Sequence, residues 1–208
     1  MRNPLIDHYD ALIDENNDPV HDPAPLKDYM DKWDGDRFIN DLQLSGDKSV
    51  LEIGVGTGRL ALCVVPNCGR FVGIDISPKT IERARENLAE HKNVEMICDD
   101  FMIHEFDGSF DVIYSSLTFM HIEDKQAAVN KVAALLNLDG RFVLSIDKNQ
   151  DEYIDTGDRK LQIFPDKPGE ILSFIKDAGL IIVKQYDTEF AHIFVAEKKS
   201  KDPCLSKH

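Results

Sequence analysis

The chain has 208 residues, 42% of them hydrophobic, and its 38 acidic against 24 basic residues give a formal net charge of −14. This length allows one α/β domain with a substantial core and some decoration, and it argues against a second full domain. The negative charge repels phosphate backbones, so we expect no nucleic acid partner.

The first segment, residues 1–45, contains four prolines and shows helical patterning only over residues 26–42. We interpret it as an extension without a core of its own, followed by a domain over residues 46–198 and a polar, disordered tail over residues 199–208. The N-terminus lacks a hydrophobic signal core, and no apolar run approaches the ~20 residues that span a bilayer. These observations predict a cytoplasmic protein with no membrane partner.

The segment from Val50 to Leu60 joins an apolar strand to a helix through glycines 54, 56 and 58. Glycine permits positive φ and close backbone approach, and the following helix offers unpaired amide donors at its start. A second apolar strand, residues 71–74, ends on Asp75, which is positioned to accept hydrogen bonds from a ribose diol. Together these features predict a nucleoside-binding βαβ unit.

The spacing of the glycines distinguishes between nucleosides. A dinucleotide motif G-x-G-x-x-G would place its last glycine where this chain has Arg59, and a P-loop would need a Lys-Ser/Thr pair that is missing here. The observed order is E-x-G-x-G-x-G, beginning at Glu52. Neither phosphate-binding motif fits.

Helices and strands alternate through the rest of the chain. Ser77 and Pro78 begin a helix, and further helices are expected over residues 124–136 and 168–178, the last ending at Gly179. This alternation predicts a parallel sheet. The final apolar segments, 180–186 and 190–196, are separated by a link too short for a parallel crossover, so they must form an antiparallel hairpin. The polar stretch 147–159 is interpreted as a solvated surface loop, with substrate binding as the alternative.

Four segments in the order of the chain resemble the class I S-adenosylmethionine-dependent methyltransferases. The glycine segment resembles their motif I, residues 93–100 their third strand, and residues 107–122 their fourth strand with the loop after it. Residues 135–144 resemble their L-x-P-G-G turn and fifth strand, although Leu138 and Asp139 replace the usual Pro-Gly. The resemblance covers residues 48–147.

This resemblance implies a Rossmann-like three-layer α/β sandwich. Its seven-stranded sheet would be mostly parallel, with one antiparallel strand and the order 3-2-1-4-5-7-6. It also implies S-adenosylmethionine as the cofactor and S-adenosylhomocysteine as the product.

The resemblance further implies a set of cofactor-binding residues. They are Glu52, Gly54, Val55, Gly56, Thr57, Gly58, Asp75, Ile76, Asp99, Asp100, Phe101, Ser115 and Ser116, with Tyr9 and Trp33 as aromatic lid residues from the extension. Asp75 would bind the ribose, Asp99 the adenine amine, and Ser115 the amino acid end. Several alternatives remain open: Glu52 as a structural acid, Asp75 as a turn residue, Asp100 in place of Asp99, and ordinary packing for both lid aromatics.

His121 and Tyr9 are the catalytic candidates, although the sequence assigns no secure base. A histidine can remove a proton from a hydroxyl acceptor, whereas a neutral amine needs no base, and His121 can equally be a helix-start residue bonded to backbone. The four cysteines, 63, 68, 98 and 204, lack paired spacing. They are interpreted as free thiols, three of them in core-like segments, and we expect no metal.

The sequence therefore predicts an S-adenosylmethionine-dependent methyltransferase that acts on an oxygen or nitrogen atom of a small-molecule acceptor, as a monomer or homodimer. A catalytically silent cofactor-binding regulatory module is the alternative. An NAD-dependent oxidoreductase is a further alternative, against which Arg59 argues.

Overall fold

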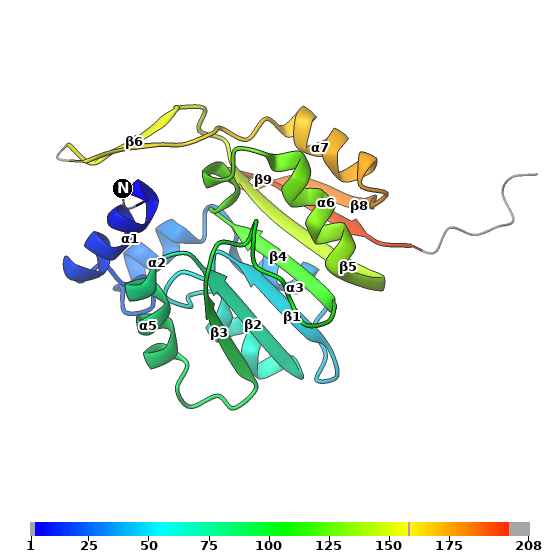
Figure 1. The fold of residues 1–208 in the computed structure, drawn as a ribbon, viewed down its shortest axis with the longest axis horizontal. Coiled ribbons are helices and arrows are strands. Elements are labelled where there is room, and N and C mark those ends of the chain that lie inside the picture. The colour runs from blue at the N-terminus through cyan, green and yellow to red at the C-terminus, as the bar shows by residue number, and fades with distance from the viewer. Residues whose placement is uncertain (1–2, 158, 200–208) are drawn as a thin grey trace, which may run out of the picture.

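The computed structural model describes residues 3–157 and 159–199, and these residues form a main sheet covered by helices on both faces (Figure 1). The sheet has seven strands in the order β3-β2-β1-β4-β5-β9-β8. The strands are β1 (Ser49–Ile53), β2 (Arg70–Asp75), β3 (Val94–Cys98), β4 (Phe110–Ser116), β5 (Leu136–Asp147), β8 (Ile181–Asp187) and β9 (Ala191–Glu197).

Pairing in this sheet is parallel except at β9, which runs antiparallel to both of its neighbours, β5 and β8. The predicted order is confirmed once a separate antiparallel hairpin, β6 (Tyr153–Asp155) with β7 (Lys160–Gln162), is left out of the count. That hairpin corrects the interpretation of residues 147–159 as a solvated loop. Each of its strands has only three residues, too few to show the alternation of apolar and polar residues that predicts a strand.

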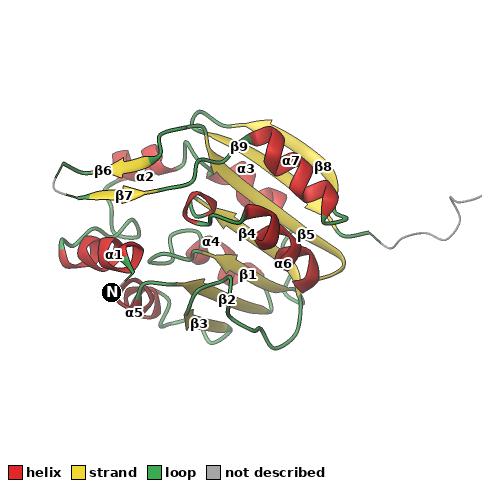
Figure 2. Cartoon of the chain, turned by 45° about the horizontal axis from the view of Figure 1, so that its top comes forward, coloured by secondary structure: helices red, strands yellow, loops and turns green. Residues whose placement is uncertain are grey.

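Helices form the outer layers of the predicted three-layer sandwich (Figure 2). On one face α6 (Lys125–Leu135) and α7 (Pro168–Asp177) bury apolar side chains against the sheet. On the other face the packing comes from α3 (Gly35–Asp41), α4 (Ala61–Val64) and α5 (Pro78–Asn87). The remaining helical elements are α1 (Pro4–Asp14), α2 (Ala24–Met30), η1 (Val65–Asn67) and η2 (Phe119–His121).

The helix boundaries follow the local signals in the sequence. Ser77 caps α5 by accepting from the Thr80 amide at 3.2 Å, and Asp124 caps α6 by accepting from the Ala127 amide at 2.9 Å. Gly179 follows α7 with φ +80°, the left-handed conformation expected of a C-terminal glycine.

One expectation about helices was wrong, and one expected helix is short. Helical structure in the extension is not confined to residues 26–42, because Asn3 accepts from the Leu5 amide and Pro4 opens α1. The helix after the glycines is a single turn, α4, continued by the 3₁₀ turn η1.

The cysteines are less buried than expected. Cys68 is buried, whereas the free thiols of Cys63 and Cys98 are exposed, since Cys63 lies on the outer side of α4 and Cys98 lies on the edge strand β3. Cys204 and the expected tail from residue 200 lie outside the described residues. Within residues 3–157 and 159–199, no helix is long and apolar enough to cross a membrane.

Candidate functional site

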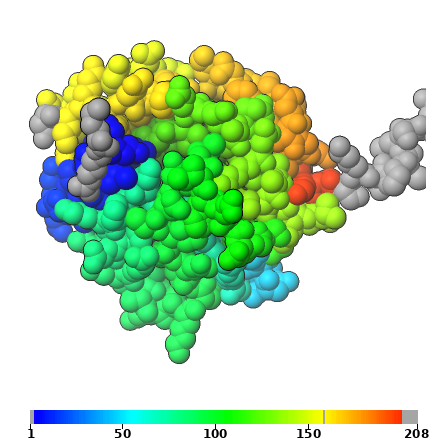
Figure 3. Space-filling view, in the orientation of Figure 1, coloured from blue at the N-terminus to red at the C-terminus, as the bar shows by residue number. Residues whose placement is uncertain are grey.

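A cavity of about 940 Å³ lies at the carboxyl ends of β1, β2 and β4. Ligands of open α/β sheets bind at this edge. The N-terminal residues and the β6–β7 hairpin lie beside each other on this side of the molecule, in blue and yellow in Figure 3. Both contribute to the cavity wall, through Asn3, Pro4, Leu5, Tyr9, Pro19 and Met30 from the extension and Tyr153, Lys160, Leu161, Gln162 and Phe164 from the hairpin and the chain after it.

The glycine turn, residues 54–58, forms the floor of this cavity. Gly54, Gly56 and Gly58 have φ values of +75°, +56° and +96°. A Cβ on Gly54 would lie 2.0 Å from Thr118 Oγ1, whereas one on Gly56 would meet nothing within 4 Å. Gly58 is not among the lining residues. A Cβ there would lie 3.1 Å from Leu88 Cδ1, so its place in the turn is set by packing against the end of α5.

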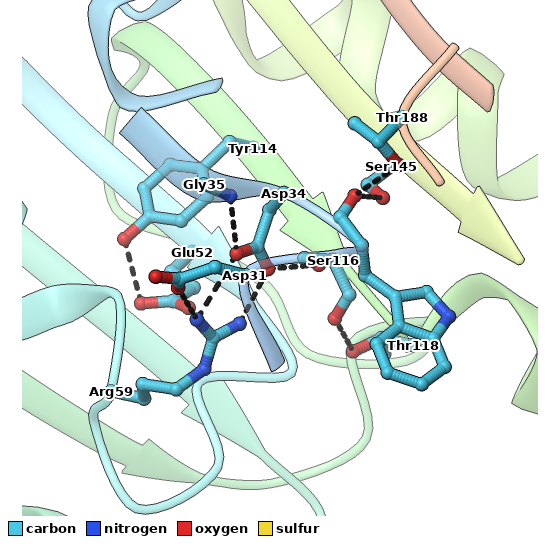
Figure 4. A network of polar contacts seen from close by, with 11 residues as sticks. Asp31, Asp34, Gly35, Glu52, Arg59, Tyr114, Ser116, Thr118, Ser145 and Thr188 are labelled. Carbon is cyan, nitrogen blue, oxygen red and sulfur yellow. Dashed lines mark hydrogen bonds and ion pairs between the residues drawn. The ribbon is translucent and has the colours of Figure 1, made fainter. Parts of the chain in front are cut away.

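Glu52, one residue before the end of β1, lines the cavity, and its carboxyl group accepts from the Tyr114 hydroxyl at 2.7 Å (Figure 4). Burial raises the pKa of Glu52 to about 8. The side chain is only 3% exposed. Glu52 is therefore held by a structural hydrogen bond and also faces the cavity, a geometry compatible with either role left open by the sequence.

Asp75 likewise faces the cavity and opens a turn. Its carboxylate accepts from the Gly56 amide at 3.1 Å and from the Ser77 amide at 3.0 Å. Burial raises its pKa, against the opposing effect of these bonds. A carboxylate has about four acceptor positions, so two remain for a ligand.

At the neighbouring strand end, Asp99 pairs with His104 Nδ1 at 2.8 Å and accepts from the Asp100 amide at 2.8 Å. The hydrogen bond from His104 is the main cause that lowers the pKa of Asp99. Asp99 lines the cavity together with three other predicted residues, which are Asp100, Ile76 and Phe101. The apolar side chains of Ile76 and Phe101 provide surface for a flat ring between two acidic strand ends.

Tyr9 of α1 and His121 of η2 meet at the cavity wall although they are 112 positions apart. The Tyr9 hydroxyl lies 2.7 Å from His121 Nε2. Burial lowers the pKa of His121 to about 4, so its ring is neutral at physiological pH, and burial raises the pKa of Tyr9. Among the described residues, His121 Nδ1 has no hydrogen-bond partner.

Besides Gly58, two further predicted site residues do not reach the cavity. Ser115 is fully buried and donates to the Ile53 carbonyl at 2.9 Å, while its neighbour Ser116 lines the cavity. Trp33 packs instead on Phe190 and Tyr29, with ring centroids 4.7 and 5.3 Å away, beside a separate hollow of about 220 Å³. Its side chain is therefore not a lid over the glycine turn.

The sequence did not point to Arg59 as a cavity residue, and it offered substrate binding by residues 147–159 only as the alternative to a surface loop. Arg59 lines the cavity and binds Asp34 of the extension. The hairpin is fixed by the Phe164 amide, which donates to the Met120 carbonyl at 2.8 Å, and by an Arg159–Glu15 ion pair of 2.8 Å to the C-terminal end of α1. In the part of the chain that the structure describes, no cluster of three or more His, Cys, Asp or Glu side chains is arranged to hold a metal ion.

Residues 51–144 match a family model described as a methyltransferase domain. The chain is 25% identical to an uncharacterised methyltransferase of Schizosaccharomyces pombe, over 88% of this chain and 74% of that protein. It is 34% identical to a malonyl-[acyl-carrier protein] O-methyltransferase of Acetivibrio thermocellus, over 50% of this chain but only 38% of that protein.

Among solved structures, the N-methyltransferase NodS of Bradyrhizobium japonicum in complex with S-adenosylhomocysteine superposes with a TM-score of 0.71. The comparison covers 95% of this chain and 100% of NodS at 16% identity, which shows a shared fold alone.

Proposed function

We propose that this chain is a class I S-adenosylmethionine-dependent methyltransferase that transfers a methyl group to an oxygen or nitrogen atom of a small-molecule acceptor, as its matched domain, its relatives and its fold support. The observation that carries this proposal is a single cavity with two kinds of wall. One wall consists of the glycine turn and the acidic strand ends, and the other holds the Tyr9–His121 pair, the extension and the hairpin. A volume of about 940 Å³ lies at the upper end of the range for single-ligand pockets and suits a cofactor with an acceptor.

The residues present fit S-adenosylmethionine. Asp75 retains acceptor positions for two ribose hydroxyls after its two amide bonds, and the space above Gly56 is open for the amino acid end. Ile76 and Phe101 would pack on the adenine, and Asp99 would accept from its amine. When bound, the cofactor supplies an electrophilic methyl group on a positively charged sulfur.

The chain's own contribution to the reaction is alignment and proton handling. Holding two reactants in line supplies several kcal/mol. We propose that a hydroxyl acceptor donates to the Tyr9 oxygen while the Tyr9 proton is directed at His121 Nε2, so that the acceptor proton can leave through this pair as the new bond forms. A neutral amine needs only to be oriented by the same pair. We also propose that residues 1–45 act as a lid, since Tyr9 and Met30 come from them.

Calorimetry with S-adenosylmethionine and S-adenosylhomocysteine, followed by methyl transfer to a panel of hydroxyl and amine acceptors, tests the proposal. We expect both cofactor forms to bind and the panel to yield methylated product. Failure of both to bind at millimolar concentration would overturn it. Binding without any turnover would favour a silent cofactor-binding regulatory module instead.

We further propose that the protein is cytoplasmic, that it is a monomer or a homodimer, and that its acceptor is not a nucleic acid. The net charge of −14 supports the last point. Methylation of purified tRNA by the protein would contradict it.

A further inference from the structure

A buried carboxylate, Asp34, binds Arg59 and Ser116, two residues that line the cavity (Figure 4). Its side chain is 0% exposed and accepts hydrogen bonds from three parts of the chain. The Gly35 amide donates at 2.7 Å, the Ser116 hydroxyl at 2.9 Å, and Arg59 Nη1 at 3.0 Å, while Arg59 Nη2 donates to the second oxygen. Asp31 is a second, more exposed partner, 3.4 Å from Arg59 Nη1.

These bonds join the extension to two elements that line the cavity, the end of the glycine turn and the end of β4. Asp34 follows α2, whose last residue, Met30, lines the cavity. Arg59 follows the glycine turn directly, and Ser116 ends β4. Arg59 and Ser116 line the cavity whereas Asp34 does not, so Asp34 acts on a ligand only through them.

The strength of the link follows from its geometry. A guanidinium that gives two parallel hydrogen bonds to one carboxylate is both stronger and more directional than a neutral pair. Burial excludes water that could replace either partner. A hydrogen bond to a charged group is worth about tenfold to hundredfold in an equilibrium constant.

We propose that Asp34 is a positioning residue that couples the cofactor-binding turn to the lid, so that a ligand seated on the glycine turn holds residues 24–34 closed over the cavity through Arg59. This inference rests on the proposed function, because the ligand is the adenosyl cofactor or its demethylated product. The position of residues 24–34 should therefore depend on whether a ligand is bound at the glycine turn.

A purely structural role for Asp34 predicts different behaviour. Asp34 is the N-cap of α3, and asparagine caps helices as well as aspartate does. Asp34→Asn would therefore preserve the helix cap while removing the charge that holds Arg59. If capping were its only task, the variant would respond to ligand as the wild type does.

Hydrogen–deuterium exchange with S-adenosylhomocysteine as the probe separates these cases. We compare peptides covering residues 24–34 and 51–60 in the wild type, in Asp34→Asn and in Asp14→Asn, each with and without saturating probe. Asp14→Asn is the matched control, because it removes an exposed ion pair with Lys79 from the same extension. In the wild type and the control we expect the probe to slow exchange in both peptides by about tenfold or more at the most protected amides.

In Asp34→Asn we expect the probe to protect residues 51–60 and to leave residues 24–34 unchanged, with a dissociation constant raised about tenfold. Equal protection of residues 24–34 in Asp34→Asn and the wild type would overturn the inference. So would protection of residues 51–60 alone in the wild type. Failure of the wild type to protect either peptide would instead refute the proposed function.

Arg59→Lys provides a second variant if Asp34→Asn does not fold. It keeps the positive charge but loses the two-pronged contact, so we expect the same loss of protection over residues 24–34. Protection equal to that of the wild type would contradict the coupling.

Discussion

Replacing Gly54 with alanine would test whether the glycine turn is built as described. Gly54 has φ +75°, and an added Cβ would lie 2.0 Å from Thr118 Oγ1 and 2.7 Å from Thr118 Cβ. Thr118 cannot easily withdraw, because its hydroxyl donates to the Ser116 carbonyl at 3.1 Å within the loop after β4. Gly56, two residues on, has φ +56° but open space around its Cβ position, so Gly56→Ala isolates the backbone cost.

The left-handed conformation costs an L-residue about 1–2 kcal/mol, and overpacking adds about 1–3 kcal/mol at Gly54 alone. We therefore expect Gly54→Ala to lower the free energy of unfolding by about 2–5 kcal/mol and Gly56→Ala by about 1–2 kcal/mol. Alanine also restricts the unfolded chain more than glycine does, and this stabilising effect reduces the losses of the two variants to about the same extent. At about 2–4 °C per kcal/mol for a chain of this size, Gly54→Ala should melt about 2–12 °C below Gly56→Ala.

Thermal unfolding measured by calorimetry, with and without S-adenosylhomocysteine, gives the comparison directly. In the double variant Gly54→Ala with Thr118→Gly, the clash disappears, so the combined loss should be smaller than the sum of the two single losses. Equal melting temperatures for Gly54→Ala and Gly56→Ala, or additive losses in the double variant, would refute the assignment of Thr118 as the side chain that excludes a Cβ from Gly54.

Three further predictions address other parts of the site. Tyr9→Phe removes the hydroxyl bonded to His121, so kcat for a hydroxyl acceptor should fall about 100-fold while calorimetry shows retained cofactor binding; an unchanged kcat would remove Tyr9 from the chemistry. Glu52 has its pKa raised from 4.5 to about 8, so the folded state binds more protons than the unfolded state in that window. The contribution of Glu52 to the free energy of unfolding is lost as pH rises from about 4.5 to 8. The free energy of unfolding in urea should therefore fall less steeply with pH for Glu52→Gln than for the wild type, and equal slopes would contradict this. Trp33→Phe should leave the affinity for S-adenosylhomocysteine within about twofold in calorimetry, since Trp33 lies outside the cavity, and a tenfold loss would reinstate it as a lid residue.

The parts of the fold that the sequence predicted are those with local signals. Ser77, Asp124 and Gly179 mark helix ends through their own side chains or backbone freedom, and each lies at the end of an element that the structure contains. The sheet order followed from the family resemblance and from the short link between the last two strands. The start of α1 carried a similar signal in Asn3 and Pro4, which the sparse apolar pattern of the extension concealed.

What the sequence could not predict depends on contacts across the chain. Strand β4 is buried on both faces, so its sequence shows no alternation of polar and apolar residues. The sequence therefore does not distinguish Ser115, which donates to the carbonyl of Ile53 in β1, from Ser116, which lines the cavity. The side chain of Trp33 is directed by packing on Phe190, more than 150 positions away in the sequence. Strands β6 and β7 pair only with each other, and neither is long enough to be predicted from its own sequence.

The β6–β7 hairpin leaves the end of β5 at Asp147 and the chain rejoins the helical layer at Pro168, both outside the matched residues 51–144. Residues 148–167 therefore contribute to the cavity wall without supplying the strand ends or the glycine turn. Under the proposed function, exchange of this one surface segment would alter the acceptor side of the cavity and leave the cofactor side in place. Grafting the segment from a relative would then change which acceptor fits while the cofactor side of the cavity stays the same.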